Sequence, residues 1–119
     1  MDIDLGDEIQ VRIEKVDGRK VVYVEGELAL PAAGGLRLVL MEAMKAGQAT
    51  VLDASGVTAL DLCGLQLLCS AHRTYRRNGA SLELRAEPPE VREIAQAAGF
   101  QGGGSACACP GDGRCLWRR

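Results

Sequence analysis

The chain has 119 residues, which suffices for one small domain with a single core and leaves no room for a second. A formal net charge of −2 argues against nucleic-acid binding, and no apolar run approaches the roughly 20 residues of a membrane span. Hydrophobic residues make up 47% but include only one Trp, two Tyr and one Phe, so an aliphatic core, typical of an α/β domain, is expected.

The N-terminal residues MDIDLGDEIQ are acidic and lack the basic-then-apolar layout of a signal peptide. The chain also contains five cysteines, an odd number that favours reduced thiols over a disulfide framework. We therefore expect a cytoplasmic protein.

Two strands are predicted at the start of the chain. Ile9, Val11 and Ile13 alternate with polar residues, which is the pattern of a half-buried strand. The dipeptide Asp17-Gly18 supplies a turn, and residues 20–25 then form a more continuous apolar run. This pattern predicts a hairpin whose second strand is the more buried.

A first helix is expected over residues 31–47, since Pro31 suits a first turn and Gly47 suits a helix end. Because each interior glycine weakens a helix by about 1 kcal/mol, Gly34 and Gly35 predict a frayed or late first turn. Four apolar residues at helical spacing should face the sheet: Leu36, Val39, Leu40 and Ala43.

A buried third strand is predicted over residues 49–53, followed by a short polar turn at 54–56. Asp61 is then suited to cap a second helix over 62–77, because its carboxylate can accept from free backbone N–H groups. Asn78-Gly79 is a stop signal. The helical spacing turns one set of side chains inward, namely Leu65, Leu68, Ala71 and Tyr75, and another outward, namely Gln66, Ser70, Arg73 and Arg76.

Residues 81–85 alternate as a fourth strand, and Pro88-Pro89 begins a last helix that presents Val91, Ile94, Ala95 and Ala98 before Gly99. Strands separated by helices imply parallel, right-handed crossovers. The prediction is a single α/β domain over residues 1–100, with a mixed, mostly parallel sheet of four to five strands and helices packed against it. Residues 101–119, which contain three successive glycines, are predicted to be a flexible Gly/Cys-containing tail.

Asp53 and Asp61 invite interpretation as a catalytic carboxylate pair. Acid–base catalysis also needs a polar partner and a substrate, and the neighbouring candidates are only Ser55, Thr58 and Cys63. Turn and cap roles explain both aspartates more simply.

His72 is the only histidine, so any Ser–His or Cys–His arrangement would depend on it. It lies mid-helix beside arginines, where a solvated or half-buried side chain is expected. No glycine-rich phosphate loop is present. We therefore expect no enzymatic activity and no cofactor; a thiol or zinc enzyme using Cys63, His72 and the tail cysteines is the remaining alternative.

The tail offers three soft ligands, Cys107, Cys109 and Cys115. Structural zinc normally takes four ligands at CxxC-type spacing, so these three are weak candidates and no metal site is predicted. Two other interpretations stay open. Leu116-Trp117 could anchor the tail on the domain or on a partner, or the tail could be disordered.

The segment LDASGVTALDLCGLQLL, residues 52–68, resembles the centre of STAS domains, which occur in sulfate transporters and in bacterial anti-sigma-factor antagonists. There a strand reading hydrophobic-Asp-x-Ser-Gly-Val is followed by Asp-Ser-Ser-Gly-Leu. VVYVEGELAL and EPPEVREIAQAAGF resemble the opening and the ending of the same domain, so the resemblance covers about residues 9–100. One departure is clear: the family's phosphorylatable Ser or Thr corresponds to Leu62.

The resemblance implies a non-enzymatic switch that binds a partner serine kinase or anti-sigma factor. It places the contact on the loop around Asp61 and the exposed side of the next helix, with Asp61, Leu62, Cys63, Gly64, Gln66 and Ser70 as partner-binding residues. In the family, phosphorylation adds a charge of about −2 to this contact and breaks it, and Leu62 cannot be modified in that way. The alternatives are a STAS adaptor of a chemotaxis-type signalling complex and a lipid ABC transporter subunit; a homodimer is left open.

Overall fold

The computed structural model describes residues 2–4, 9–45, 49–98 and 116. Five strands form one sheet in the order of the chain: β1 (Asp2–Asp4), β2 (Ile9–Val16), β3 (Arg19–Leu28), β4 (Thr50–Leu60) and β5 (Leu82–Arg85). The pairs β1–β2 and β2–β3 are antiparallel, whereas β3–β4 and β4–β5 are parallel. The predicted α/β fold with a mixed sheet is confirmed.

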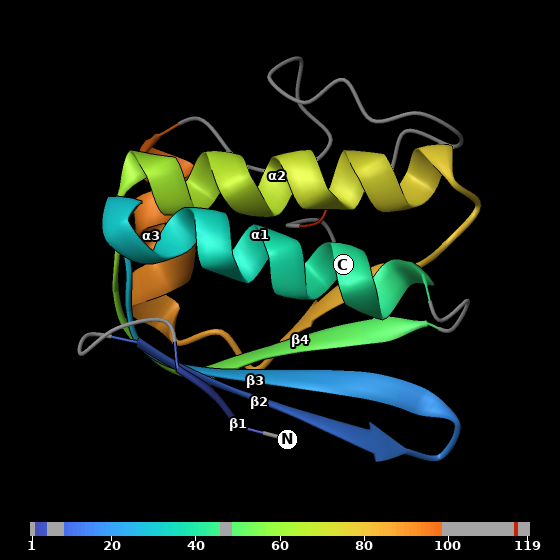
Figure 1. Cartoon of the computed structure of the whole chain (residues 1–119). Helices are drawn as coiled ribbons and strands as arrows, with labels where there is room; N and C mark the ends of the chain where they lie inside the picture. The colour runs from blue at the N-terminus through green and yellow to red at the C-terminus, as the bar shows by residue number, and fades with distance from the viewer. Residues whose placement is uncertain (1, 5–8, 46–48, 99–115, 117–119) are drawn as a thin grey trace.

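Three helices complete the domain: α1 (Leu30–Lys45), α2 (Leu62–Arg77) and α3 (Pro89–Ala97). Helices α1 and α2 pack side by side over one face of the sheet (Figure 1). Helix α1 connects β3 to its parallel neighbour β4, and α2 connects β4 to its parallel neighbour β5. Helix α2 therefore begins where β4 ends. Among the described residues, no helix is long and apolar enough to cross a membrane.

The turn between β2 and β3 follows from local chemistry. Asp17 and Gly18 have φ of 51° and 77°, and Val16 pairs with Arg19 across them. Two central residues with positive φ match the right-handed twist of the flanking strands. The predicted hairpin is confirmed, and Val21, Val22 and Val24 of β3 are buried.

The predicted turn at 54–56 is wrong, because β4 continues through it to Leu60. The pairing of β4 with β3 shifts register twice, between Tyr23 and Glu25 and between Gly26 and Glu27, and at each shift β4 contains one residue more than β3. A Cβ on Gly56 would lie 2.6 Å from Glu25 Cγ. Gly56 therefore permits a close approach of two strands at this irregularity rather than a reversal of the chain.

Helix α1 already begins at Leu30 and includes Gly34 and Gly35, so the expected late start is wrong. Packing of its apolar stripe outweighs the low helix propensity of glycine. The four residues predicted to face the sheet are all buried: Leu36, Val39, Leu40 and Ala43. Gly47, the predicted helix end, lies outside the described residues.

Tyr75 is fully buried at the centre of the core and joins three elements. Its hydroxyl is hydrogen-bonded to the Leu40 carbonyl of α1 and, at 3.2 Å, to the Thr50 hydroxyl of β4. A buried phenol satisfied in this way fixes α2 over the sheet. The inward-facing set predicted for α2, Leu65, Leu68, Ala71 and Tyr75, is buried as expected.

Helix α3 contacts the core more narrowly than predicted. Val91 and Ala95 are buried, but Ile94 is 38% exposed and Ala98 is exposed, so these two inward assignments are wrong. In this helix of nine residues, only Val91 and Ala95, which are spaced i, i+4, form the buried stripe. Leu116, in contrast, is buried and belongs to the core cluster, although it lies in the predicted tail.

Candidate functional site

The start of α2 is held by its cap. Asp61 has extended backbone angles, and its carboxylate accepts a hydrogen bond of 2.8 Å from the Gly64 N–H. The Asp61 N–H donates to the Leu28 carbonyl at the end of β3, at 3.3 Å. The predicted capping role is confirmed, and the helix start is fixed to two neighbouring strands.

Gly64 lies on the buried side of this first turn. A Cβ at this position would meet the Leu28 carbonyl oxygen at 2.5 Å and Leu60 Cδ1 at 2.8 Å. The helix can approach the ends of β3 and β4 so closely only because residue 64 has no side chain. Gly64 is therefore a packing residue, and its predicted place among the partner-contacting residues must be corrected.

The remaining predicted contact residues share one surface. Leu62, Gln66 and Ser70 are spaced i, i+4, i+8, so they form a stripe along α2, flanked by Asp61 and Cys63. Leu62 is 55% exposed, Asp61 and Gln66 are exposed, and Cys63 and Ser70 are half-buried. We call these five residues the α2 stripe. An apolar side chain at the start of a well-held helix is its main feature.

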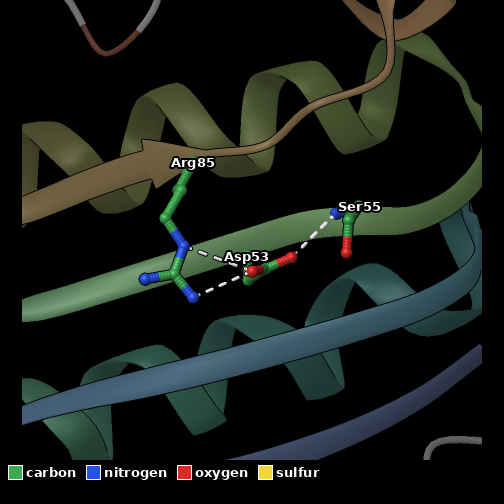
Figure 2. Close-up of polar contacts among 3 residues, drawn as sticks. All are labelled: Asp53, Ser55 and Arg85. Carbon is green, nitrogen blue, oxygen red and sulfur yellow. Dashed lines mark hydrogen bonds and ion pairs between the residues drawn. The ribbon is translucent and has the colours of Figure 1, made fainter. Parts of the chain in front are cut away.

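Asp53 belongs to a different part of the molecule, the sheet face that points away from α1 and α2. Arg12, Tyr23, Asp53 and Arg85 are successive partners across β2, β3, β4 and β5, so they form one cross-strand row. We call this row the open face. Figure 2 shows Asp53 with Arg85 and Ser55. Asp53 Oδ2 accepts from Arg85 Nε at 3.2 Å and Nη2 at 2.9 Å, and Oδ1 accepts from the Ser55 N–H at 3.0 Å. The Arg12 guanidinium lies 4.6 Å from the Tyr23 ring centroid.

The extended course of β4 separates the two aspartates. Each residue of a strand rises about 3.3 Å, so Asp53 and Asp61 lie on the order of 25 Å apart. General acid–base catalysis requires both groups to reach one substrate. The catalytic carboxylate pair is therefore excluded, and the turn role of Asp53 is replaced by an ion pair across β4 and β5.

The surroundings of Asp53 favour the ionised form of its carboxylate. Burial tends to raise the pKa of Asp53, but hydrogen bonds from Ser55 and Arg85, with the charge of Arg85, lower it overall. The pKa of Arg85 is raised, chiefly by its hydrogen bond to Asp53. Sequence analysis missed this pair, although Asp53 and Arg85 are the last residues of the predicted strands 49–53 and 81–85, which become parallel neighbours.

Replacing Arg85 by alanine should lower the free energy of unfolding by about 1–3 kcal/mol at neutral pH. The carboxylate of Asp53 is only 10% exposed and would lose its counter-charge. Because the folded-state pKa of Asp53 is lowered, the stabilisation is present above about pH 4 and is lost as the pH falls through that pKa. Urea unfolding at neutral pH and near pH 3 measures both effects.

Arg12→Ala is the control, since the ion pair of Arg12 with Glu14, at 3.5 Å, is about half exposed on both sides. Such surface pairs contribute less than about 1 kcal/mol. Equal losses for the two variants, or a loss for Arg85→Ala that does not shrink in acid, would refute the assignment.

His72 is buried on the inner side of α2, so the expectation of a solvated or half-buried side chain is wrong. Within residues 2–4, 9–45, 49–98 and 116, no group of three His, Cys, Asp or Glu residues is arranged to hold a metal ion. Cys107, Cys109 and Cys115 lie outside the described residues.

Comparison with known proteins gives one family and a consistent fold. The family model described as "Mlab, STAS domain" matches residues 11–105. An anti-sigma factor antagonist from Mycobacterium paratuberculosis is 26% identical, with a TM-score of 0.63 over 78% of this chain and 80% of that one. The sequence has no match among curated proteins.

Two further solved structures share the fold. The Bacillus anti-sigma factor antagonist SpoIIAA, in its unphosphorylated form, is 20% identical, with a TM-score of 0.64 over 76% of this chain and 81% of that one. The murine anion transporter Slc26a9 is 23% identical, with a TM-score of 0.56 over 70% of this chain and 14% of the transporter.

Proposed function

The chain belongs to the STAS domain family, and we propose that it is a non-enzymatic regulatory module of the anti-sigma-factor antagonist type that binds a protein partner through the α2 stripe. The observation that carries this proposal is the 55% exposure of Leu62 directly after the cap residue Asp61. The partner class is an anti-sigma factor or serine kinase. A cytoplasmic location fits this role.

The α2 stripe has the chemistry of a small contact surface. Leu62 supplies apolar area, and Gln66 and Ser70 supply polar groups along the same side of the helix. The Asp61 cap and the close contact of Gly64 with Leu28 hold this surface before a partner arrives. Pre-organisation of this kind lowers the entropic cost of binding, and a central apolar side chain commonly contributes much of the affinity.

Partner binding at this surface is not regulated by phosphorylation of residue 62. Phosphorylation would add a charge of about −2, next to the carboxylate of Asp61, but leucine has no hydroxyl to accept the group. We infer that binding is constitutive or is controlled elsewhere. Ser55 and Thr58 are exposed hydroxyl residues of β4, and Cys63 is a half-buried free thiol on the stripe itself.

An in vitro phosphorylation assay with an anti-sigma-factor kinase tests this assignment. Wild type should remain unmodified, whereas Leu62→Ser should gain one phosphate at residue 62, because the substitution restores the hydroxyl on an exposed helix start. Leu62→Ala is the matched control and should remain unmodified. Mass spectrometry of proteolytic fragments locates the phosphate.

Two results would overturn the proposal. One is phosphate on Ser55 or Thr58 of the wild type, accompanied by release of the partner. The other is a Leu62→Ser protein that stays unmodified by a kinase active on other members of the family, since position 62 would then not be the equivalent site.

A subunit of a membrane transport complex is the second candidate function. It is favoured by the similarity of this fold to 14% of an anion transporter chain. Stable association with an integral membrane transporter, and none with an anti-sigma factor, would support it over the first. The chemotaxis-type adaptor and the homodimer stay predictions.

A further inference from the structure

Charged side chains of this domain are separated between its two ends. Helices α1 and α2 both finish at the end where the turn between β2 and β3 lies (Figure 1). The Lys20 N–H donates to the Ala49 carbonyl at 3.0 Å, so β3 and β4 also start side by side here. Four exposed cationic side chains belong to these element ends: Lys15, Arg19, Lys45 and Arg77. We call these four residues the basic end.

Few carboxylates offset the charge of the basic end. Three half-buried cations lie near the same element ends, namely Lys20, Arg73 and Arg76. Among the described residues of this region, the acidic ones are Glu14, Asp17 and Glu42. Glu42 is paired with Lys45 at 3.2 Å, and both side chains are largely exposed. This end is therefore positive, although the whole chain has a formal net charge of −2.

The opposite end of the domain is acidic. Exposed carboxylates lie where β3 ends, where α2 begins and along α3: Glu27, Asp61, Glu90 and Glu93. Helix α2 has 16 residues and rises about 1.5 Å per residue, so Asp61 and Arg77 lie about 24 Å apart. Since the Debye length is about 10 Å in 0.1 M salt, a negative surface at the basic end is attracted there and is screened from this carboxylate.

Helix dipoles account for only half of the basic end. Cations in the last turn of a helix interact favourably with its terminal carbonyl groups, which explains Lys45 and Arg77. Lys15 and Arg19 lie on β2 and β3, and sheets have only small net dipoles. Between these two cations along the chain, the apolar side chain of Val16 is 42% exposed. Cations beside an exposed apolar group match the surface of an anionic bilayer, which offers phosphates above an apolar layer.

We propose that the basic end is a docking surface for an anionic phospholipid bilayer, with Val16 entering the headgroup region. The four cations come from two strands and two helices, so they are spread over the sheet layer and the helix layer and do not converge on one point. A small anion needs convergent donors, whereas a bilayer presents many phosphates in one plane, and each nearby Lys or Arg adds attraction.

This docking mode is independent of the proposed protein contact at the α2 stripe. Asp61 and Leu62 lie at the other end of α2 and point away from a bilayer that touches Arg77. A docked molecule therefore keeps the α2 stripe accessible to a protein partner.

Co-sedimentation of the full chain with lipid vesicles tests the proposal. Wild type should bind vesicles of phosphatidylcholine with about one-third phosphatidylglycerol and should not bind pure phosphatidylcholine. Binding should be lost when NaCl is raised from about 0.1 M to about 1 M, because the Debye length falls to about 3 Å. The double variant Arg19→Glu with Arg77→Glu should weaken binding by more than about tenfold, since each cation near an anionic leaflet contributes about fivefold.

The matched control is Arg12→Glu with Arg37→Glu, which makes the same change in net charge at exposed residues. Arg12 lies about 13 Å from Val16 along β2, and Arg37 lies about 12 Å from Lys45 along α1, both more than a Debye length away. This control should bind the anionic vesicles much more tightly than Arg19→Glu with Arg77→Glu. The neutral pair Arg19→Gln with Arg77→Gln should show an intermediate loss, and a thermal melt of each variant verifies that it is folded.

Three results would overturn the proposal. The first is equal binding of wild type to the anionic and the pure phosphatidylcholine vesicles. The second is an equal loss for the two charge-reversed double variants, which would mean that net charge alone matters. The third is a wild type that ignores anionic vesicles but binds a polyglutamate peptide through Arg19 and Arg77, since the occupant would then be an acidic protein segment.

Discussion

Replacing Gly64 by alanine should lower the free energy of unfolding by about 3 kcal/mol, the upper part of the range for overpacked sites. The new Cβ would lie 2.5 Å from the Leu28 carbonyl oxygen, which is backbone and also accepts the Asp61 N–H. Relief requires the first turn of α2 to move away from β3. Such a shift would strain the 2.8 Å hydrogen bond between Gly64 and Asp61. Chemical denaturation measures the loss.

Gly34→Ala is a control that should change the free energy of unfolding in the opposite direction. A Cβ on Gly34 meets nothing within 4 Å, and the residue is exposed inside α1. Alanine favours the helix by about 0.5–1 kcal/mol over glycine, so this variant should be more stable than wild type. If Gly64→Ala behaved like Gly34→Ala, the close approach of α2 to β3 and β4 would not exist as described.

Replacing Leu62 by aspartate should weaken partner binding by about 100-fold, equivalent to about 2.7 kcal/mol. The change removes apolar area and adds a second charge beside Asp61 at the N-terminal end of the α2 stripe. Folding should be little affected, since residue 62 is exposed and an acidic residue is favourable in the first helical turn. Calorimetric titration with an anti-sigma factor partner, alongside a thermal melt, separates the two effects.

Leu38→Asp is the matched control, because Leu38 is a more exposed leucine on the neighbouring helix and lies outside the α2 stripe. It should bind the partner as wild type does. Equal affinities for Leu62→Asp and wild type would remove Leu62 from the interface.

Local chemistry made part of the fold predictable from the sequence. The Asp17-Gly18 turn and the Asp61 cap each depend on a few adjacent residues, and both are confirmed. The alternation and helical spacing of apolar residues located β2 and the buried side of α2. The exposure of Leu62 agrees with the exposed side of the helix that the family resemblance implied.

Features that depend on residues distant in the sequence were not predicted. Asp53 and Ser55 were interpreted as turn residues, but both lie within β4, whose pairing with β3 is irregular at this point. The Asp53–Arg85 ion pair depends on the register of β4 and β5, and the burial of Leu116 depends on the tertiary fold. Gly64 fitted the family motif, but the motif does not distinguish a packing residue from a contact residue.

Amide chemical-shift mapping of the isotope-labelled protein, titrated with an anti-sigma factor partner, tests the proposed binding surface most directly. The proposal predicts that the largest perturbations fall on the α2 stripe, at Asp61, Leu62, Cys63, Gln66 and Ser70, while the open-face residues Arg12, Tyr23 and Arg85 keep their shifts. Perturbations confined to the open face, with the α2 stripe unchanged at saturation, would contradict it.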